Sequence, residues 1–265
     1  MSRRVRHILS LSGGKDSTAL AIYMRGRVPE IEYVFCDTEK ELPETYDYLK
    51  RLEAYLGKPI VVLKHDGRDF DHHLALRRGY LPSHRVRWCT ELLKIRPFEA
   101  YVGDDEITSY IGIRADEDRL GYISRRPNIT ARYPFKEDGI VKDDVMSILA
   151  NSGLGLPDYY RWRSRSGCYF CFFQQLIEWV GLLENHPELF AAAMAYEKDD
   201  LSDGRRFTWN PDQSLRELSR PQRIAAIKSE HARRMHEMRR TGPSTSLLEL
   251  YEDDSDQLPC VICRL

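Results

Sequence analysis

The sequence contains no long hydrophobic run. Its 265 residues include no apolar stretch of about 18 residues, the least that a transmembrane helix needs. We therefore expect no membrane-spanning helix and no membrane partner. The positively charged N-terminus is followed by an apolar run that is too short for a signal peptide. Together these absences predict a cytoplasmic protein.

Cysteine is scarce and neither sign of charge dominates. In a cytoplasmic protein the six cysteines are more often metal ligands or redox groups than structural disulfides. A formal net charge of −1 gives no global argument for nucleic-acid binding. Two segments are nevertheless basic with aromatic residues between the charges, residues 77–88 (RRGYLPSHRVRW) and residues 161–168 (RWRSRSGC). For both, nucleic-acid contact and an ordinary solvated surface remain open.

Apolar β-forming runs alternate with helical patterns along the first part of the chain. A hydrophobic content of 42% allows a sizeable core, and this alternation implies βαβ units with parallel strands. We predict an α/β fold, a doubly wound and mostly parallel five-stranded sheet over residues 1–140, followed by a helical C-terminal region over residues 141–265. The expected strands are residues 7–11, 31–36, 59–65, 107–114 and 128–135, and the main helices after the first are 42–57, 89–103, 141–153, 173–200 and 220–240.

A Ser-Gly-Gly-Lys-Asp-Ser stretch, which begins at Ser12, joins the first predicted strand to the first predicted helix. Gly13 and Gly14 let backbone N–H groups approach an anion, and the helix N-terminus adds a favourable partial charge. Lys15 can reach phosphate oxygens, while Ser12 and Ser17 supply hydroxyl donors. The Walker A pattern fails, because it needs a glycine five positions before Gly14 and Ser or Thr directly after the lysine. The sequence therefore predicts a phosphate-binding loop of another kind.

This stretch resembles the signature of the PP-loop ATP pyrophosphatases. The resemblance implies an adenine nucleotide alpha hydrolase-like fold that binds ATP with Mg²⁺ and cleaves it between the α and β phosphates, leaving AMP. Lys15 and Asp16 are then expected to be catalytic. Asp37, at the end of the second predicted strand, is expected to contact the nucleotide or to hold Mg²⁺. The implied cofactor-binding residues of the loop are Ser12, Gly13, Gly14, Lys15, Asp16 and Ser17.

The rest of the chain resembles the branch of this family that contains PAPS reductase. The segments WCTELLKIRP and GIRADEDR are similar to motifs of that branch and contain Lys94, Arg114 and Arg119. These three cations are candidate phosphate clamps, since a guanidinium can grip two oxygens at once, and Lys94 and Arg114 are also expected to be catalytic. Ordinary surface charge is the alternative for each. Further matching segments are VFCDTEKELPETYDYLKRL, DDVMSILANSGLGLPDYY and SGCYFC, in the order of the family.

Two departures from the family select among its functions. Assimilatory PAPS and APS reductases carry a degraded loop without the lysine and a C-terminal Glu-Cys-Gly-Leu-His motif. This chain keeps Lys15 and ends in LPCVICRL. It is therefore most similar to the DndC/SspD type, which works with a cysteine desulfurase and other phosphorothioation proteins to place sulfur in the DNA backbone. The alternatives are PAPS or APS reductase-like reduction of activated sulfate, thiolation of tRNA, and a non-catalytic nucleotide sensor.

Two C-x-x-C pairs are present, Cys168 with Cys171 and Cys260 with Cys263. Such a pair lets two thiolates converge on one metal ion or cluster. One possible ligand set is a Zn²⁺ site that uses both pairs. The other is a [4Fe–4S] cluster on Cys89, the first pair and one C-terminal cysteine. The resemblance favours the cluster, because related iron–sulfur proteins place a ligand at the position of Cys89.

Arginines flank the predicted cluster ligands. Arg85 and Arg87 come shortly before Cys89, and Arg161 and Arg163 come shortly before the first C-x-x-C pair. A guanidinium grips phosphate oxygens and stacks on bases. If the cluster lies near the nucleotide, these arginines should border the same cleft and contact DNA, or tRNA in the alternative.

Overall fold

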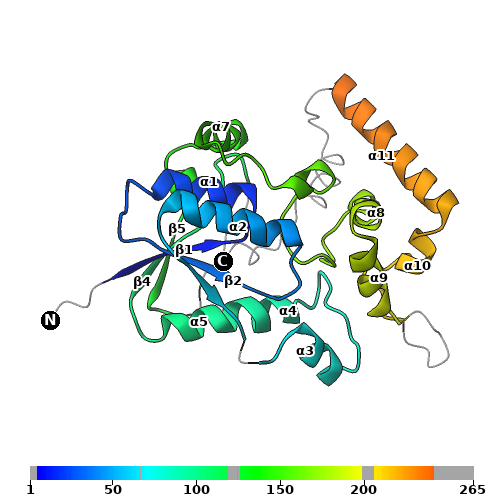
Figure 1. Ribbon diagram of the computed structural model, residues 1–265, viewed down its shortest axis with the longest axis horizontal. Coiled ribbons are helices and arrows are strands. Elements are labelled where there is room, and N and C mark those ends of the chain that lie inside the picture. Colours follow the sequence, from blue (N-terminus) through cyan, green and yellow to red (C-terminus); the bar gives the residue numbers. More distant parts are fainter. Residues whose placement is uncertain (1–4, 66, 119–123, 125, 199–205, 242–265) are drawn as a thin grey trace.

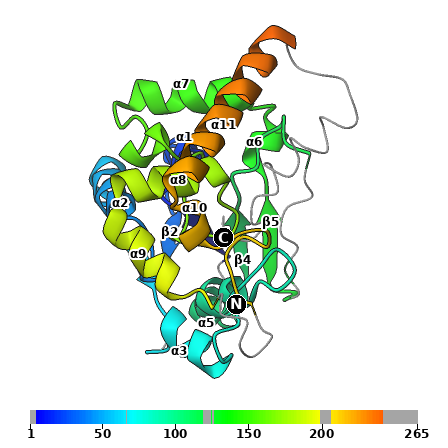
Figure 2. The same ribbon diagram turned by 90° about the vertical axis from the view of Figure 1, so that its right-hand side faces the viewer.

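The computed structural model of the chain is shown in two views (Figures 1 and 2). The predicted site residues Arg119, Cys260 and Cys263 lie outside the residues that it describes. No helix in the described part of the chain is long and apolar enough to cross a membrane. The described residues are 5–65, 67–118, 124, 126–198 and 206–241.

One five-stranded sheet organises the N-terminal part of the molecule. Every strand pairing in it is parallel, and the strand order is β3-β2-β1-β4-β5. The predicted α/β class and the five predicted strands are confirmed. The strands are β1 (Arg6–Leu11), β2 (Glu32–Cys36), β3 (Ile60–Leu63), β4 (Ile107–Tyr110) and β5 (Ile129–Arg132).

The predicted helical segments contain helices as well, but the segment predicted over 173–200 forms two shorter helices divided at His186, where Pro187 begins the second. The stretch around Pro97 stays helical, because a π-helical turn directly precedes the helix that contains the proline. The helical elements are α1 (Lys15–Met24), α2 (Pro43–Leu56), α3 (Phe70–Leu76), α4 (Trp88–Thr90), the π turn η1 (Glu91–Ile95), α5 (Arg96–Val102), α6 (Pro134–Glu137), α7 (Lys142–Ser152), the 3₁₀ turn η2 (Asp158–Arg161), α8 (Leu176–Asn185), α9 (Pro187–Ala195), α10 (Leu215–Leu218) and α11 (Pro221–Thr241).

Helices cover both faces of the sheet, as a parallel sheet requires (Figure 1). Successive residues of a strand point to opposite faces. Leu9 and Leu11 of β1 accordingly pack in one buried cluster with residues of α1, α2 and α7, while Ile8 packs with Phe98 and Val102 of α5 in another. The sheet is therefore buried on both sides, and only its strand ends are available for a ligand.

A second core, rich in aromatic side chains, lies beside the sheet. Phe70 of α3 stacks on Trp88 with ring centres 5.1 Å apart, and Phe170 stacks on Trp209 at 4.8 Å. This cluster joins α3 and α4 to the segments that contain α8, α9 and α10. The domain boundary near residue 140 stays a prediction. We note that α7, which follows this position, packs on α1 in the core of the sheet.

Candidate active site

The Ser-Gly-Gly-Lys-Asp-Ser loop lies at the carboxyl end of β1. This strand pairs with β2 on one side and β4 on the other, so the loop is at the point where the strand order reverses and where open parallel sheets bind ligands. Gly13 has a φ of +69°, and a Cβ there would lie 2.6 Å from Thr45 Cγ2. Only glycine fits this turn. Ser17 Oγ accepts a hydrogen bond from the Ser12 N–H at 3.2 Å, which closes the loop.

Arg114 and Asp16 form an ion pair at the same edge of the sheet. Arg114 follows β4, and its Nη1 lies 2.8 Å from Oδ1 of Asp16 in the first turn of α1. Gly112 allows this approach, since a Cβ there would lie 3.0 Å from the Asp16 carbonyl oxygen. Burial opposes the charge of Arg114, but its bonds to Asp116 and Asp16 outweigh that effect and raise its pKa. The ion pair thus holds the Asp16 carboxylate, which is only 2% exposed, on the inner side of the loop.

Two neighbouring tyrosines of η2 contact the loop from the C-terminal part of the chain. The Tyr159 hydroxyl donates to the Gly13 carbonyl oxygen at 2.8 Å, and the Tyr160 hydroxyl accepts from the Lys15 N–H at 3.0 Å. The Lys15 ammonium lies 5.5 Å from the centre of the Tyr160 ring. The N–H group that begins α1, one of the groups expected to face phosphate, thus has a tyrosine hydroxyl as its acceptor.

The segment 159–171, which begins with these tyrosines, continues from the loop to the first C-x-x-C pair. Ser166 Oγ donates to Ser12 Oγ at 3.1 Å. A Cβ on Gly14 would lie 2.6 Å from Ser166 Oγ, so the segment sits directly on the loop. Cys168 follows two residues later. The predicted nucleotide loop and the predicted metal ligands therefore share one wall.

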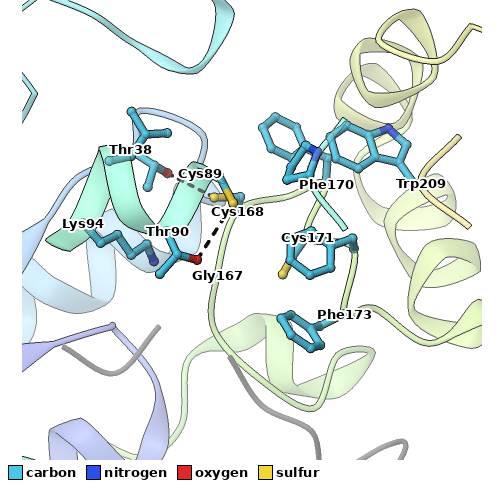
Figure 3. Close-up of a pocket in the computed structure, with 13 residues that line it drawn as sticks. Thr38, Cys89, Thr90, Lys94, Gly167, Cys168, Phe170, Cys171, Phe173 and Trp209 are labelled. Carbon is cyan, nitrogen blue, oxygen red and sulfur yellow. Dashed lines mark hydrogen bonds between the residues drawn. The ribbon is translucent and has the colours of Figure 1, made fainter. Parts of the chain in front are cut away.

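The three described cysteines of the predicted ligand set line a single pocket, and Figure 3 shows their side chains around it. Cys168 Sγ lies 3.1 Å from Thr38 Oγ1 and 3.8 Å from Oε1 of Glu41. Burial, together with the nearby Glu41 carboxylate, raises the pKa of the Cys168 thiol well above its usual value. The residues around the pocket include Thr38, Pro82, Cys89, Thr90, Leu93, Lys94, Cys168, Phe170, Cys171, Phe173 and Trp209.

Lys94 and Glu41 form a buried ion pair at this pocket. Lys94 lies on η1, and its Nζ is 3.9 Å from Glu41 Oε1, with both side chains less than a tenth exposed. Glu41 follows β2 in the predicted CDTEKE segment but was not predicted as a site residue. No local pattern separates it from Glu39; the antiparallel bridge between Glu41 and Cys168 brings it to the pocket. Lys94 thus lies beside the cysteines, where its expected role as a phosphate clamp stays a prediction.

Asp37 directly follows β2, and its carboxylate is already held by neighbouring groups. Its Oδ1 accepts hydrogen bonds from the Glu39 N–H and the Tyr46 hydroxyl, both at 2.8 Å. Its Oδ2 lies 3.5 Å from Lys64 Nζ. Asp37 therefore orders the turn that leads from β2 to Thr38 and the cysteine pocket. Its contact with a nucleotide or with Mg²⁺ stays a prediction.

The three described cysteines are of the right chemical type to bind a metal ion or a cluster. In the described residues, however, they are not arranged around one metal position. Thiols are the ligands that iron–sulfur clusters and structural zinc use, and Cys89, Cys168 and Cys171 share one pocket. Within the described ranges no group of three or more His, Cys, Asp and Glu side chains is arranged to hold a metal ion. The cluster and its zinc alternative therefore stay predictions.

The four flanking arginines have different surroundings. Arg85 and Arg161 are exposed, and the Arg87 guanidinium lies 4.9 Å from the ring centre of Phe173. Arg163 is only 2% exposed and donates to the carbonyl oxygens of Gly167 and Cys168 at 3.2 and 2.9 Å. Its expected surface contact with nucleic acid does not agree with this burial. Arg163 instead holds the backbone at the first C-x-x-C pair.

The similarity to a known protein family lies in the N-terminal part of the chain. Residues 6–130 match the family model of the phosphoadenosine phosphosulfate (PAPS) reductase domain. The matched segment contains the loop, Cys89 and Arg114 and ends before Cys168. The chain is thus similar to the PAPS reductase domain over somewhat less than half of its length, in the part where the sequence resembles that branch.

Two curated relatives extend the similarity beyond the matched domain. An uncharacterized protein of Methanocaldococcus jannaschii is 27% identical over 213 residues, which cover 74% of this chain and 50% of that protein. An uncharacterized nin region protein of Escherichia phage lambda is 25% identical over 197 residues, which cover 62% of this chain and 65% of that protein. The chain thus spans less than two thirds of the length of either relative.

A solved structure supports the fold. The crystal structure of PAPS reductase from Candida auris, in complex with phosphate, superposes with a TM-score of 0.51 at 12% identity. The superposition covers 62% of this chain and 82% of that one. At this identity the likeness concerns the arrangement of strands and helices alone.

Proposed function

We propose that this chain is an ATP pyrophosphatase that activates a DNA backbone for the incorporation of sulfur. ATP would be cleaved to AMP and pyrophosphate at the Ser12–Ser17 loop. A cysteine desulfurase would supply the sulfur. One observation carries the proposal: segment 159–171 connects an intact phosphate-type loop to a pocket that three cysteines line.

The loop offers the groups that cleavage between the α and β phosphates needs. A DNA phosphate oxygen attacks the α-phosphorus, the bond to the bridging oxygen breaks, and pyrophosphate leaves with the electron pair. Lys15 and the N–H groups that begin α1 stabilise the charge on the departing pyrophosphate. Asp16 lies between Lys15 and Arg114, at 3.6 and 2.8 Å, and therefore orients both cations toward the strand ends. Mg²⁺ enters with ATP and neutralises part of its charge.

The cysteine pocket provides the second half of the reaction: the outer sulfur of a persulfide from the desulfurase attacks the activated phosphorus, and AMP leaves with the bridging oxygen. A thiol then attacks the inner sulfur, which releases the phosphorothioate and leaves a disulfide. A cluster held by Cys89, Cys168 and Cys171 would supply a metal centre that binds sulfur. The protein groups around it exclude water, because aromatic side chains such as Phe170 and Trp209 line the pocket. The Glu41–Lys94 pair holds opposite charges beside Cys168. The transfer of sulfur would thus take place in a pocket that excludes water and lies next to the nucleotide loop.

The competing function is a reductase of activated sulfate, which the name of the matched family model favours. Lys15 argues against it, because a protein that receives an already activated nucleotide has no γ-phosphate to bind. The two functions consume different substrates. Release of sulfite from PAPS in the presence of thioredoxin would establish the reductase.

Product analysis tests the proposal directly. Purified protein is incubated anaerobically with MgATP, DNA, cysteine and a cysteine desulfurase, and the nucleotide products are separated. The expected result is AMP and pyrophosphate together with nuclease-resistant phosphorothioate linkages in the DNA. ADP and orthophosphate as the main products would overturn the pyrophosphatase assignment. AMP and pyrophosphate without sulfur in DNA would keep the first half and reject DNA as the acceptor.

A further inference from the structure

Two surface grooves meet beside α8 and lie on the side of the molecule away from the sheet. One runs between the segment after η2 and α8, and the other between α8 and α11. Both are lined by Gln175, Ile177 and His231, so they form one continuous groove, here called the α8–α11 groove. It begins at Tyr160, whose hydroxyl accepts the Lys15 N–H, and reaches Arg234 on α11. One end of the groove is therefore lined by the tyrosine that contacts the Ser12–Ser17 loop, while the loop residues themselves are not among its lining residues.

One face of α11 forms the far wall of the groove. Helix α11 is 21 residues long, about 30 Å, and packs against α8 (Figures 1 and 2). Ile227 is buried in the aromatic core and fixes the rotation of the helix. The residues of α11 that reach the part of the groove beyond Gln175 follow helical spacing. They are Arg223, Ala226, Ile227, Glu230, His231 and Arg234, and Lys228 lines the other part.

Cations outnumber acids among the exposed side chains that line the groove. Four are cationic, and only Glu184 and Glu230 are acidic. Lys228 Nζ lies 2.5 Å from Glu184, and Arg234 Nε lies 3.0 Å from Glu230, yet all four of these side chains remain at least 44% exposed. Exposed pairs of this kind are weak and exchange readily for phosphate. The exposed cations are Arg161, Arg223, Lys228 and Arg234.

An indole ring lies in the groove between its cations. Trp162 packs on Gly181 of α8, where a Cβ would lie 2.7 Å from the ring, so a glycine is required beneath it. Trp162 is partly exposed, whereas the other three tryptophans are at most 5% exposed. The segment is held in place by Glu178, which accepts from the N–H and the hydroxyl of Ser164 at 2.6 Å. The ring is thus fixed at the surface at a small entropic cost.

We infer that the α8–α11 groove binds a single DNA strand and guides its backbone to the ATP loop. This inference rests on the proposed function and names the path of its acceptor. Cationic side chains that track a backbone, with an aromatic ring on which a base can stack, are the features with which proteins bind single strands. The basic and aromatic pattern of RWRSRSGC is explained in this way, because Arg161 and Trp162 line the groove while Arg163 holds the backbone beneath it.

The charges of α11 provide the first test, with fluorescein-labelled oligothymidylate as the probe. In the variant Lys228→Gln/Arg234→Gln, binding at low salt should weaken roughly tenfold. The slope of log affinity against log salt should fall by about 1.4, since each phosphate contact on a single strand contributes about 0.7. Lys50→Gln is the control, because Lys50 is 75% exposed on α2 and does not line the groove. It should change neither affinity nor slope.

Tryptophan fluorescence provides the second test. Oligothymidylate should quench the emission of the wild-type protein, and Trp162→Phe should remove most of this response while circular dichroism and melting temperature stay unchanged. Wild-type affinity and slope in the double variant would overturn the inference, as would quenching that persists in Trp162→Phe. Tighter binding of oligouridylate than of oligothymidylate would make RNA the occupant and would also overturn it. Failure of the proposed function is separate, since it would appear as absent AMP formation in the wild-type protein.

Discussion

The Ser12–Ser17 loop and the cysteine pocket are built in opposite ways although segment 159–171 lies against both. The loop is a contiguous hexapeptide whose turn comes from its own glycines and from the strand and helix on either side, with added hydrogen bonds from Tyr159, Tyr160 and Ser166. The pocket is assembled from four distant parts of the chain, around Thr38, Cys89, Cys168 and Trp209. A contiguous motif keeps its geometry wherever its strand and helix form. The pocket exists only when the aromatic core is packed, and so it should be the more fragile of the two.

The largest expected effect concerns the cysteine pocket. Anaerobically purified protein should be brown, with broad absorption at about 400 nm that is typical of [4Fe–4S] centres. Changing Cys89, Cys168 or Cys171 to Ser should remove nearly all of the iron and the colour, because each replaces a thiolate ligand. Iron analysis and visible spectra check this expectation. ATP binding should survive in each variant if the loop is independent of the pocket.

Cys36 provides the control for these variants. It lies on β2, is 3% exposed, and its burial raises its pKa to about 11, so it stays a neutral thiol. Cys36→Ala should leave the iron content unchanged. Colourless wild-type protein with stoichiometric zinc would reject the cluster in favour of the zinc site.

The next largest effect is expected when Lys15 of the loop is removed. Lys15→Ala should lower the rate of AMP formation at least about a hundredfold, which corresponds to about 2.7 kcal/mol of barrier, because the charge on the leaving pyrophosphate loses its main partner. Lys50→Ala is the control, since Lys50 is 75% exposed on α2, where it pairs with Asp47. A Lys15→Ala enzyme with near wild-type turnover would remove this lysine from the mechanism.

The sequence predicted the loop better than the pocket for the same physical reason. Strand alternation and the glycine pair are local signals, and both the five strands and the strand-to-helix turn were predicted from them. Tyr160 and Glu41 were not, because no periodic pattern shows that a tyrosine after Pro157 will reach a helix 145 residues earlier. Arg163 was predicted at the surface, since a basic segment does not reveal which guanidinium will turn inward to backbone carbonyls.

The ion pair behind the loop allows a comparison of stability. Arg114→Gln should lower the free energy of unfolding by about 2 kcal/mol, because it leaves the buried Asp16 carboxylate without its closest cation. Arg132→Gln breaks an ion pair with Glu137 in which the arginine side chain is 54% exposed, and it should cost less than about 1 kcal/mol. Urea unfolding followed by circular dichroism measures both. Equal losses would show that Asp16 is not desolvated as its burial implies.

The smallest expected effect separates the two tyrosines that join the pocket to the loop. The Tyr160 hydroxyl accepts the Lys15 N–H, a group that a phosphate oxygen would need, so Tyr160→Phe should release a competitor and lower the KM for ATP. A hydrogen bond of about 1 kcal/mol corresponds to a change of about fivefold. Tyr159→Phe should act in the opposite direction, because the Tyr159 hydroxyl supports the Gly13 carbonyl and so holds the loop in its binding conformation. Steady-state kinetics of AMP formation distinguishes the two variants. A higher KM in both would mean that Tyr160 supports the loop as Tyr159 does, and that the pocket side of the shared wall stabilises the nucleotide site instead of competing for it.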